Sequence, residues 1–173
     1  MNRIYLKKIT SVSKNYLKWM NDNEVMKMTF SYNNTFKIRG RRFTREILKR
    51  YIKKINSSTN NKLFGIFIKK SNVHIGNIKL GDIHPIHKHC DIGLIIGLKE
   101  YWGQGFASEA IYQATEIGFE SGLNKVYAAI SQLNIASIKA CVNAGYKRVG
   151  TLKKHYFIDG KYVDRVYMEK LNV

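Results

Sequence analysis

The segment that most constrains this chain is a glycine-rich turn that joins an apolar run to a helical pattern. The apolar run covers residues 92–98, the turn covers residues 101–105, and helical spacing begins at Phe106. The first N–H groups of a helix have no partner inside it, and the helix dipole favours negative charge there. Glycine also lets an anion approach the backbone closely. The turn therefore favours a phosphate site, with a simple tight connection as the equal alternative on this pattern alone.

Two common phosphate motifs do not fit this turn. A P-loop requires Lys followed by Ser or Thr after its last glycine, whereas Phe106 and Ala107 stand there. The dinucleotide fingerprint requires an acidic residue about 20 positions further on, and the residue near that position is Lys125. Both motifs are therefore weaker explanations than a resemblance to another family.

The turn and four further blocks resemble one family. Residues 102–110, Trp-Gly-Gln-Gly-Phe-Ala-Ser-Glu-Ala, are similar to the pyrophosphate-binding turn of the GNAT acyl-CoA N-acetyltransferase superfamily, in the branch with ribosomal-protein and polyamine acetyltransferases. Residues 19–25, 134–146 and 150–164 resemble other family segments in order and spacing. Residues 74–87 resemble a bacterial subgroup often met in cell-surface polysaccharide pathways.

The resemblance implies an α/β fold of three layers, in which helices flank a central mixed, mostly antiparallel sheet. It also implies that residues 1–173 form a single GNAT N-acetyltransferase domain, and a chain of this length can bury a sizeable core. Periodicity and turn residues are compatible with this fold but do not select it. They predict strands at residues 3–9, 63–69, 73–82, 91–98, 125–131, 146–158 and 162–171, and helices at 15–21, 41–55, 106–121 and 135–143.

The resemblance also implies that acetyl-CoA is the cosubstrate. It assigns the pantetheine arm to the strand edge at Ile95, Ile96 and Gly97, where the family's strand splays from its neighbour and one N–H polarises the thioester carbonyl, as in an oxyanion hole. Asn134 matches an asparagine that bonds this arm, with helix N-capping as its alternative role. The pyrophosphate is assigned to the backbone amides of Gly103, Gln104, Gly105, Phe106, Ala107 and Ser108.

The catalytic groups are less well marked. A primary amine is mostly protonated at neutral pH, so a base or proton relay is useful. Asp91 stands where related chains often carry Glu, which makes it the candidate base, with a structural hydrogen bond as the alternative. Cys141 stands where many relatives carry a Tyr that protonates the leaving thiolate, and inert packing is its alternative role. Tyr146, Tyr156 or water would then supply the proton.

Three histidines, His84, His87 and His89, lie just before Asp91. Imidazoles titrate in the range that a proton relay needs, although exposure on the surface is the default for each ring. With Cys90 they form a conceivable zinc set, but the spacing matches no common zinc site. We therefore expect no metal.

The formal net charge of +18 favours polyanionic ligands, but Lys, Asn and Ile are frequent along the whole chain, so most of this charge is compositional. The positive charge is most concentrated at residues 37–54, and this segment is either a solvated helix face or a rim that attracts an anionic acceptor. No apolar run approaches the length of a membrane span, and no signal peptide is recognisable. Cys90 and Cys141 fall in different elements, which is typical of a cytoplasmic chain with free thiols.

These observations favour an acetyl-CoA-dependent N-acetyltransferase that modifies a primary amine. A +18 chain attracts polycations poorly, so the preferred acceptor is a nucleotide-linked amino sugar, and a protein N-terminus is the alternative. A non-enzymatic module that binds nucleic acid or another anion explains the charge but not the glycine turn, and Phe43 and Tyr51 lie on an apolar helix face rather than on a stacking platform. A catalytically inactive relative that binds acetyl-CoA and a homodimer are further expectations by analogy.

Overall fold

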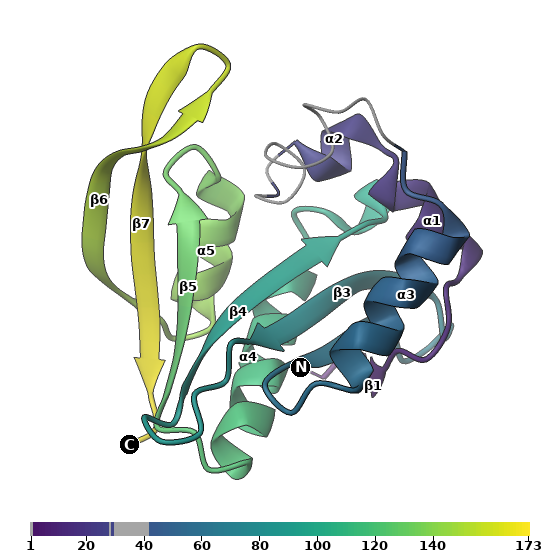
Figure 1. The fold of residues 1–173 in the computed structure, drawn as a ribbon, viewed down its shortest axis with the longest axis horizontal. Helices are drawn as coiled ribbons and strands as arrows, with labels where there is room; N and C mark the ends of the chain where they lie inside the picture. Colours follow the sequence, from purple (N-terminus) through teal and green to yellow (C-terminus); the bar gives the residue numbers. More distant parts are fainter. Residues whose placement is uncertain (1, 28, 30–41) are drawn as a thin grey trace.

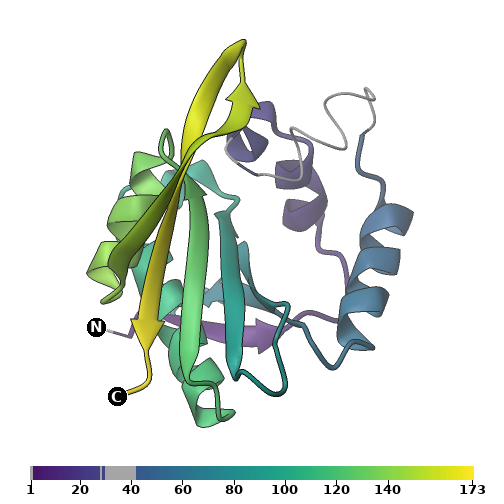
Figure 2. The same cartoon turned by 60° about the vertical axis from the view of Figure 1, so that its left-hand side comes forward.

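The computed structural model describes residues 2–27, 29 and 42–173, and within them the chain forms one seven-stranded sheet with helices on both faces (Figures 1 and 2). The strand order is β1-β2-β3-β4-β5-β7-β6. Among these strands only β4 and β5 pair in parallel, and the other neighbours are antiparallel. The expected three-layer α/β fold with a mixed, mostly antiparallel sheet is confirmed.

The observed elements lie within a few residues of their predicted positions. The strands are β1 (Ile4–Lys8), β2 (Lys62–Ile68), β3 (His74–Gly81), β4 (His89–Ile96), β5 (Lys125–Ser131), β6 (Lys147–Ile158) and β7 (Lys161–Leu171). The helices are α1 (Lys14–Met20), α2 (Asn23–Met26), α3 (Arg45–Asn56), α4 (Phe106–Glu120) and α5 (Ile135–Asn143), with a 3₁₀ turn η2 (Lys99–Tyr101). The sequence does not predict α2 and η2, because a single turn is too short to show a period.

Helix α3 begins later than predicted, because Thr44 caps it. The Thr44 hydroxyl accepts a hydrogen bond from the Ile47 N–H at 3.2 Å. The helix buries Leu48, Ile52 and Ile55 and leaves its basic residues exposed, except for Arg45, which is half-buried and donates to the Val12 carbonyl at 2.7 Å. The described part of the basic segment therefore fits a solvated helix face, and residues 37–41 lie outside the described residues.

The two faces of the sheet carry two separate buried clusters. Alternate residues of β5, such as Val126 and Ala128, point to the face that α4 and α5 cover, and they belong to the larger cluster. On the opposite face α1 packs on β3 and α3 packs on β2, around Trp19 and Leu48 (Figure 2). The second layer covers the β1–β3 side of the sheet, so it leaves the same face of β5, β7 and β6 without a helix.

The two parallel strands separate soon after they pair. The parallel pairing of β4 and β5 covers His89–Asp91 and Lys125–Tyr127, whereas β4 continues to Ile96 and β5 to Ser131. Figure 1 shows the two strands diverging toward the ends of their arrows. The expected splay is therefore present. The apolar run at residues 92–98 predicts a fully buried strand, and this prediction is wrong. Residues 94–96 are only partly buried, because no strand covers that edge.

Within the part of the chain that the structure describes, every helix is too short or too polar to cross a membrane.

Candidate functional site

Helix α4 begins at the glycine turn with its first backbone amides unpaired. Gly103 and Gly105 have φ angles of 70° and 83°, in the left-handed region that favours glycine. Gly105 is the N-cap and offers no capping side chain, and the first recorded helical bond runs from the Glu109 N–H to the Gly105 carbonyl at 3.1 Å. No described residue accepts a hydrogen bond from the N–H groups of residues 103–108. A Cβ added at Gly103 would meet nothing within 4 Å, so the turn is open to a ligand.

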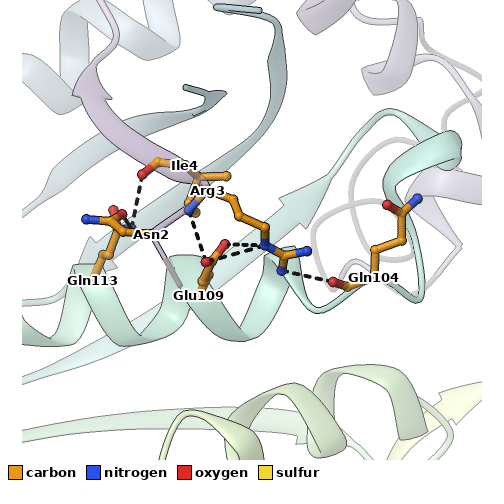
Figure 3. A network of polar contacts seen from close by, with 6 residues as sticks. All are labelled: Asn2, Arg3, Ile4, Gln104, Glu109 and Gln113. Carbon is orange, nitrogen blue, oxygen red and sulfur yellow. Dashed lines mark hydrogen bonds and ion pairs between the residues drawn. The ribbon is translucent and has the colours of Figure 1, made fainter. Parts of the chain in front are cut away.

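Arg3, just before β1, holds this turn in place (Figure 3). Its guanidinium donates to the Gln104 carbonyl at 2.9 Å and forms an ion pair with Glu109 at 3.3 Å, and its backbone N–H donates to Glu109 at 3.2 Å. The guanidinium also lies 4.2 Å from the centre of the Phe106 ring. In a trans peptide the C=O and the next N–H point in opposite directions. By fixing the Gln104 carbonyl, Arg3 therefore turns the Gly105 N–H away from itself.

The entry to the turn is fixed to β4 by two tryptophans. The Trp102 indole N–H donates to the Ile96 carbonyl at 2.8 Å. Trp19, from α1, lies directly on Gly97, and a Cβ added to Gly97 would stand 2.0 Å from the Trp19 ring. Gly97 is therefore required for packing, a role that the sequence does not reveal.

The backbone groups that face the gap between β4 and β5 belong to Leu94 and Ile96. The Gly97 N–H already donates to the Ile75 carbonyl at 2.7 Å, and hydrogen-bonded positions alternate along an antiparallel pair. Gly97 and Ile95 therefore direct their N–H groups toward β3, whereas Ile96 and Leu94 direct theirs toward the gap. Of the three residues assigned to the pantetheine arm, Ile96 alone presents backbone to the gap, and Leu94 is a position that sequence reasoning missed.

Asn134 caps α5 near the end of β5. Its side-chain oxygen accepts from the Ser137 N–H at 3.1 Å, so the capping role is present. No described residue accepts from its amide nitrogen, which leaves a donor for a ligand. The capping role and a cofactor role are compatible.

The candidates for a proton donor to the thiolate are mostly buried. Cys141 is 2% exposed in the larger core, and burial raises the pKa of its thiol to about 12. Tyr146 is 3% exposed and shares a hydrogen bond of 2.6 Å with Thr115. Both observations favour packing roles. Tyr156 on β6 is half-buried, and burial raises the pKa of its phenol.

A cavity of about 570 Å³ lies on the uncovered face of β5, β7 and β6, and Asp91 of β4 lines it. Burial raises the pKa of Asp91 to about 6; Lys79 opposes this shift, Asp82 adds to it and Arg165 opposes it. A carboxylate with this pKa is ionised at neutral pH and accepts a proton readily, so the geometry supports Asp91 as a base. The ionisable side chains of the lining are Asp82, His89, Asp91, Lys125, Tyr127, Arg165, Tyr167 and Glu169.

The three histidines before Asp91 lie against one another at the edge of this cavity, which His89 lines. The rings of His84 and His87 lie 4.2 Å apart, and those of His84 and His89 lie 5.4 Å apart. His89 alone of the three lines the cavity, and burial lowers its pKa. Among the described residues no group of three or more His, Cys, Asp or Glu side chains is arranged to hold a metal ion.

The glycine turn at the start of α4, beside two parallel strands that separate, is the arrangement that the resemblance predicts. The model of the acetyltransferase (GNAT) domain family matches residues 3–147. The chain belongs to the GNAT acetyltransferase family. That match includes β1 with Arg3, the splayed strands and the turn of this GNAT domain.

Two curated relatives each match more than half of this GNAT chain. One is an uncharacterized N-acetyltransferase, p20, of Bacillus licheniformis, 32% identical over 62% of this chain and 60% of the relative. The other is a spermidine N(1)-acetyltransferase of Vibrio cholerae, 31% identical over 54% of this chain and 56% of the relative. The chain thus spans less than two thirds of the length of these relatives.

Solved structures share the GNAT fold over nearly the whole chain. A crystal structure of spermidine N-acetyltransferase from Vibrio cholerae, in complex with CoA and spermine, superposes with a TM-score of 0.81 at 22% identity and covers 99% of this chain and 96% of that chain. A GNAT-family acetyltransferase from Bacillus anthracis gives a TM-score of 0.76 at 23% identity, over 98% and 95% of the two chains. At these identities the likeness shows the fold alone.

Proposed function

We propose that this protein is an acetyl-CoA-dependent N-acetyltransferase that acetylates a primary amine of a small acceptor. The observation that carries the proposal is the row of unpaired amides at residues 103–108, next to the unpaired edge of β4. Backbone N–H groups at a helix N-terminus suit a pyrophosphate, and a strand edge suits an amide-containing arm. Membership of the GNAT family and the CoA that the Vibrio cholerae structure contains both support this assignment.

Different residues would bind different parts of acetyl-CoA. The turn at Gly103–Ser108 holds the phosphates, and the free N–H groups of Leu94 and Ile96 hold the arm and polarise the carbonyl that it carries. Acetyl-CoA supplies the activated acetyl group as a thioester. The amide nitrogen of Asn134 supplies a further donor at the end of β5.

Asp91 would remove the proton that the acceptor amine must lose. Ile95 stands four positions after Asp91, and on an extended strand this is about 13 Å. Asp91 therefore acts through water held in the cavity, whose polar lining offers that water partners. The raised pKa of Asp91 suits such a relay, because the carboxylate is ionised at neutral pH yet basic enough to take up a proton.

The acceptor belongs to the same proposal. The amino sugar preferred from the sequence gains no support from the relatives, two of which are spermidine acetyltransferases of Vibrio cholerae and Escherichia coli. The argument against a polyamine rested on the net charge of the whole chain, but the cavity itself carries Asp82, Asp91 and Glu169. Glu169 is paired with Lys125, and Arg165 is a further cation of the lining, but Asp82 and Asp91 remain to attract an ammonium group at short range, where the distant charges of the chain are screened by salt. Spermidine is therefore a candidate acceptor beside the amino sugar.

The test is calorimetric titration of the protein with acetyl-CoA, with two matched glycine variants. Gly105→Ala and Gly122→Ala place a Cβ at positive-φ glycines just before and just after α4, with φ of 83° and 85°. Both carry similar backbone strain, but only the first disturbs the phosphate turn. We expect Gly105→Ala to weaken acetyl-CoA binding by about tenfold or more and Gly122→Ala to leave it unchanged. No saturable binding by the folded wild-type protein would overturn the proposal.

A further inference from the structure

Arg165 of β7 lies in the cavity without an acidic partner. It lines the cavity, and in the sheet it pairs with Ser131 of β5 and Leu152 of β6. None of the ion pairs among the described residues includes it. Its Nε atom is buried and has no hydrogen-bond partner in the described part of the chain, and one Nη contacts the His155 ring nitrogen at 3.2 Å. The side chain as a whole is half-buried, and its charge acts on Asp91 without forming an ion pair. A partly desolvated guanidinium without an ion-pair partner favours a ligand of opposite charge.

The fold nevertheless holds this guanidinium firmly. The Tyr167 ring lies 5.0 Å from the guanidinium carbon, and the Tyr156 ring lies 5.9 Å from it. Residues 153–155 form a bulge opposite Asp164, which brings His155 beside the guanidinium. A side chain fixed by two rings and a bulge is pre-organised, which is how proteins prepare Arg to bind a carboxylate or phosphate.

The charges of the cavity are arranged in two groups. Asp82 and Asp91 lie near the paired ends of β4 and β5, whereas Arg165 lies level with the end of β5. The other cation of the lining, Lys125, is already paired with Glu169 at 3.4 Å. The carboxylates suit an ammonium group, so the unpaired guanidinium requires a ligand group of opposite sign.

From this arrangement we infer that the acceptor carries an anionic group, a carboxylate or a phosphate, in addition to its amine, and that Arg165 binds that group and so determines acceptor specificity. The inference rests on the proposed function and narrows its substrate class. β7 is the second strand from β4, and β4 and β5 separate beyond Asp91 and Tyr127, so at the level of Arg165 the backbones of β4 and β7 lie more than two strand spacings, about 10 Å, apart. The amine and the anion therefore lie at opposite ends of the acceptor.

The experiment compares acceptors that differ only in the anionic group. Cadaverine and lysine differ by a carboxylate, and glucosamine and glucosamine 6-phosphate differ by a phosphate ester. We measure kcat/KM for each by release of CoA thiol, together with calorimetric binding of each acceptor to the CoA-loaded protein. We expect the anionic member of at least one pair to be preferred by about tenfold or more, the range of a charge-assisted hydrogen bond. The pair that shows the preference distinguishes a carboxylate from a phosphate.

Variants then assign the preference to Arg165. Because the Arg165 charge also lowers the pKa of Asp91, the variants are compared at a pH well above 7, where Asp91 is ionised in each of them. There Arg165→Gln abolishes the preference by raising the KM of the anionic acceptor, and leaves the neutral or cationic partner and acetyl-CoA unaffected. Arg165→Lys keeps part of the preference, because lysine retains the positive charge but not the planar guanidinium that binds an anion through two N–H groups. Lys161→Gln, an exposed cation at the tip of the same hairpin, serves as control and retains the whole preference.

Two results would overturn the inference. The first is that neither anionic acceptor reacts or binds better than its partner, as when spermidine and cadaverine are the best substrates. The second is that Arg165→Gln lowers kcat equally for all acceptors, which would place Arg165 at the departing thiolate instead. Failure of the proposed function is a separate result, because it appears as absent acetyl-CoA binding in the wild-type protein.

Discussion

The two sides of the opening between β4 and β5 are built in different ways. The side that would hold acetyl-CoA consists of backbone groups from residues 94–108, which follow one another in the chain. The side that would hold the acceptor consists of side chains from β4, β5, β6 and β7, among them Asp91 and Arg165. Backbone recognition depends on glycine positions and strand register, and side-chain recognition depends on individual residues. The first can therefore stay constant across a family while the second sets what each member accepts.

The largest expected effect is on the acceptor side. Asp91→Asn should lower kcat by about 10²- to 10⁴-fold, the usual contribution of general acid–base catalysis, without weakening acetyl-CoA binding. In the wild-type protein the rate should fall below about pH 6, because Asp91 then becomes protonated. A pH–rate profile checks both points.

Asp82→Asn is the matched control for the Asp91 prediction. Asp82 raises the pKa of Asp91, so its removal should move the acidic limb of the profile to lower pH while activity is retained. An unchanged acidic limb in Asp91→Asn would show that another group is the base.

The second effect tests the packing beneath the acetyl-CoA side. Gly97→Ala places a Cβ against the Trp19 ring and should reduce the free energy of unfolding by about 1–3 kcal/mol, as overpacking does. Gly93→Ala, on β4 itself, meets nothing within 4 Å and should change stability little. Urea unfolding of the two variants measures the difference, and equal stabilities would contradict the tight Trp19 contact.

A smaller effect separates the two roles of Asn134. Asn134→Ala should cost about 1 kcal/mol of stability through the lost cap, whereas Asn134→Ser keeps a capping oxygen and should be nearly neutral. If the amide nitrogen also binds the arm, both variants weaken acetyl-CoA binding by the same few-fold. If Asn134→Ser binds acetyl-CoA with normal affinity, then Asn134 serves only as the helix cap.

The smallest effect concerns a buried histidine in the α1 layer. Burial lowers the pKa of His74, which hydrogen-bonds to Asn77 at 2.9 Å and lies beside the Trp19 ring. The unfolded chain therefore takes up a proton on His74 more readily than the folded protein, and stability falls as the pH drops below about 6.5. The melting temperature of His74→Gln should depend less steeply on pH between 7.5 and 5.5 than that of the wild type. Parallel curves would show that another group controls this range.

Sequence patterns locate the acetyl-CoA side well because its determinants are local. The positive φ angles of Gly103 and Gly105 follow from glycine in a tight turn before a helix, and the Asn134 cap follows from its place before α5. The register of β4 against β3 is not local, so the sequence could not show that Leu94 rather than Ile95 faces the gap. Gly97 likewise looks like a binding position until Trp19 is seen to pack on it.

The acceptor side is less predictable, because its residues meet only in the folded sheet. Asp91 was found through its place in the family pattern, but its raised pKa comes from burial and from neighbours on other elements. Arg165 lies in an alternating strand like many surface arginines, and nothing in its local sequence marks it as unpaired. Cys141, by contrast, attracts attention in the sequence by standing where relatives have Tyr, yet it lies in the core.

The contact of Arg3 with Gln104 and Glu109 joins positions more than 100 residues apart in the chain (Figure 3). A contact of this sequence separation carries a large loop-closure cost, so whatever stabilises the turn also stabilises the strand that is joined to it. A ligand that binds the turn therefore stabilises β1, which lies at the far edge of the sheet, along with α4. Acetyl-CoA would then stabilise the N-terminal strand through Arg3, and slower hydrogen exchange at β1 would report that the turn is occupied.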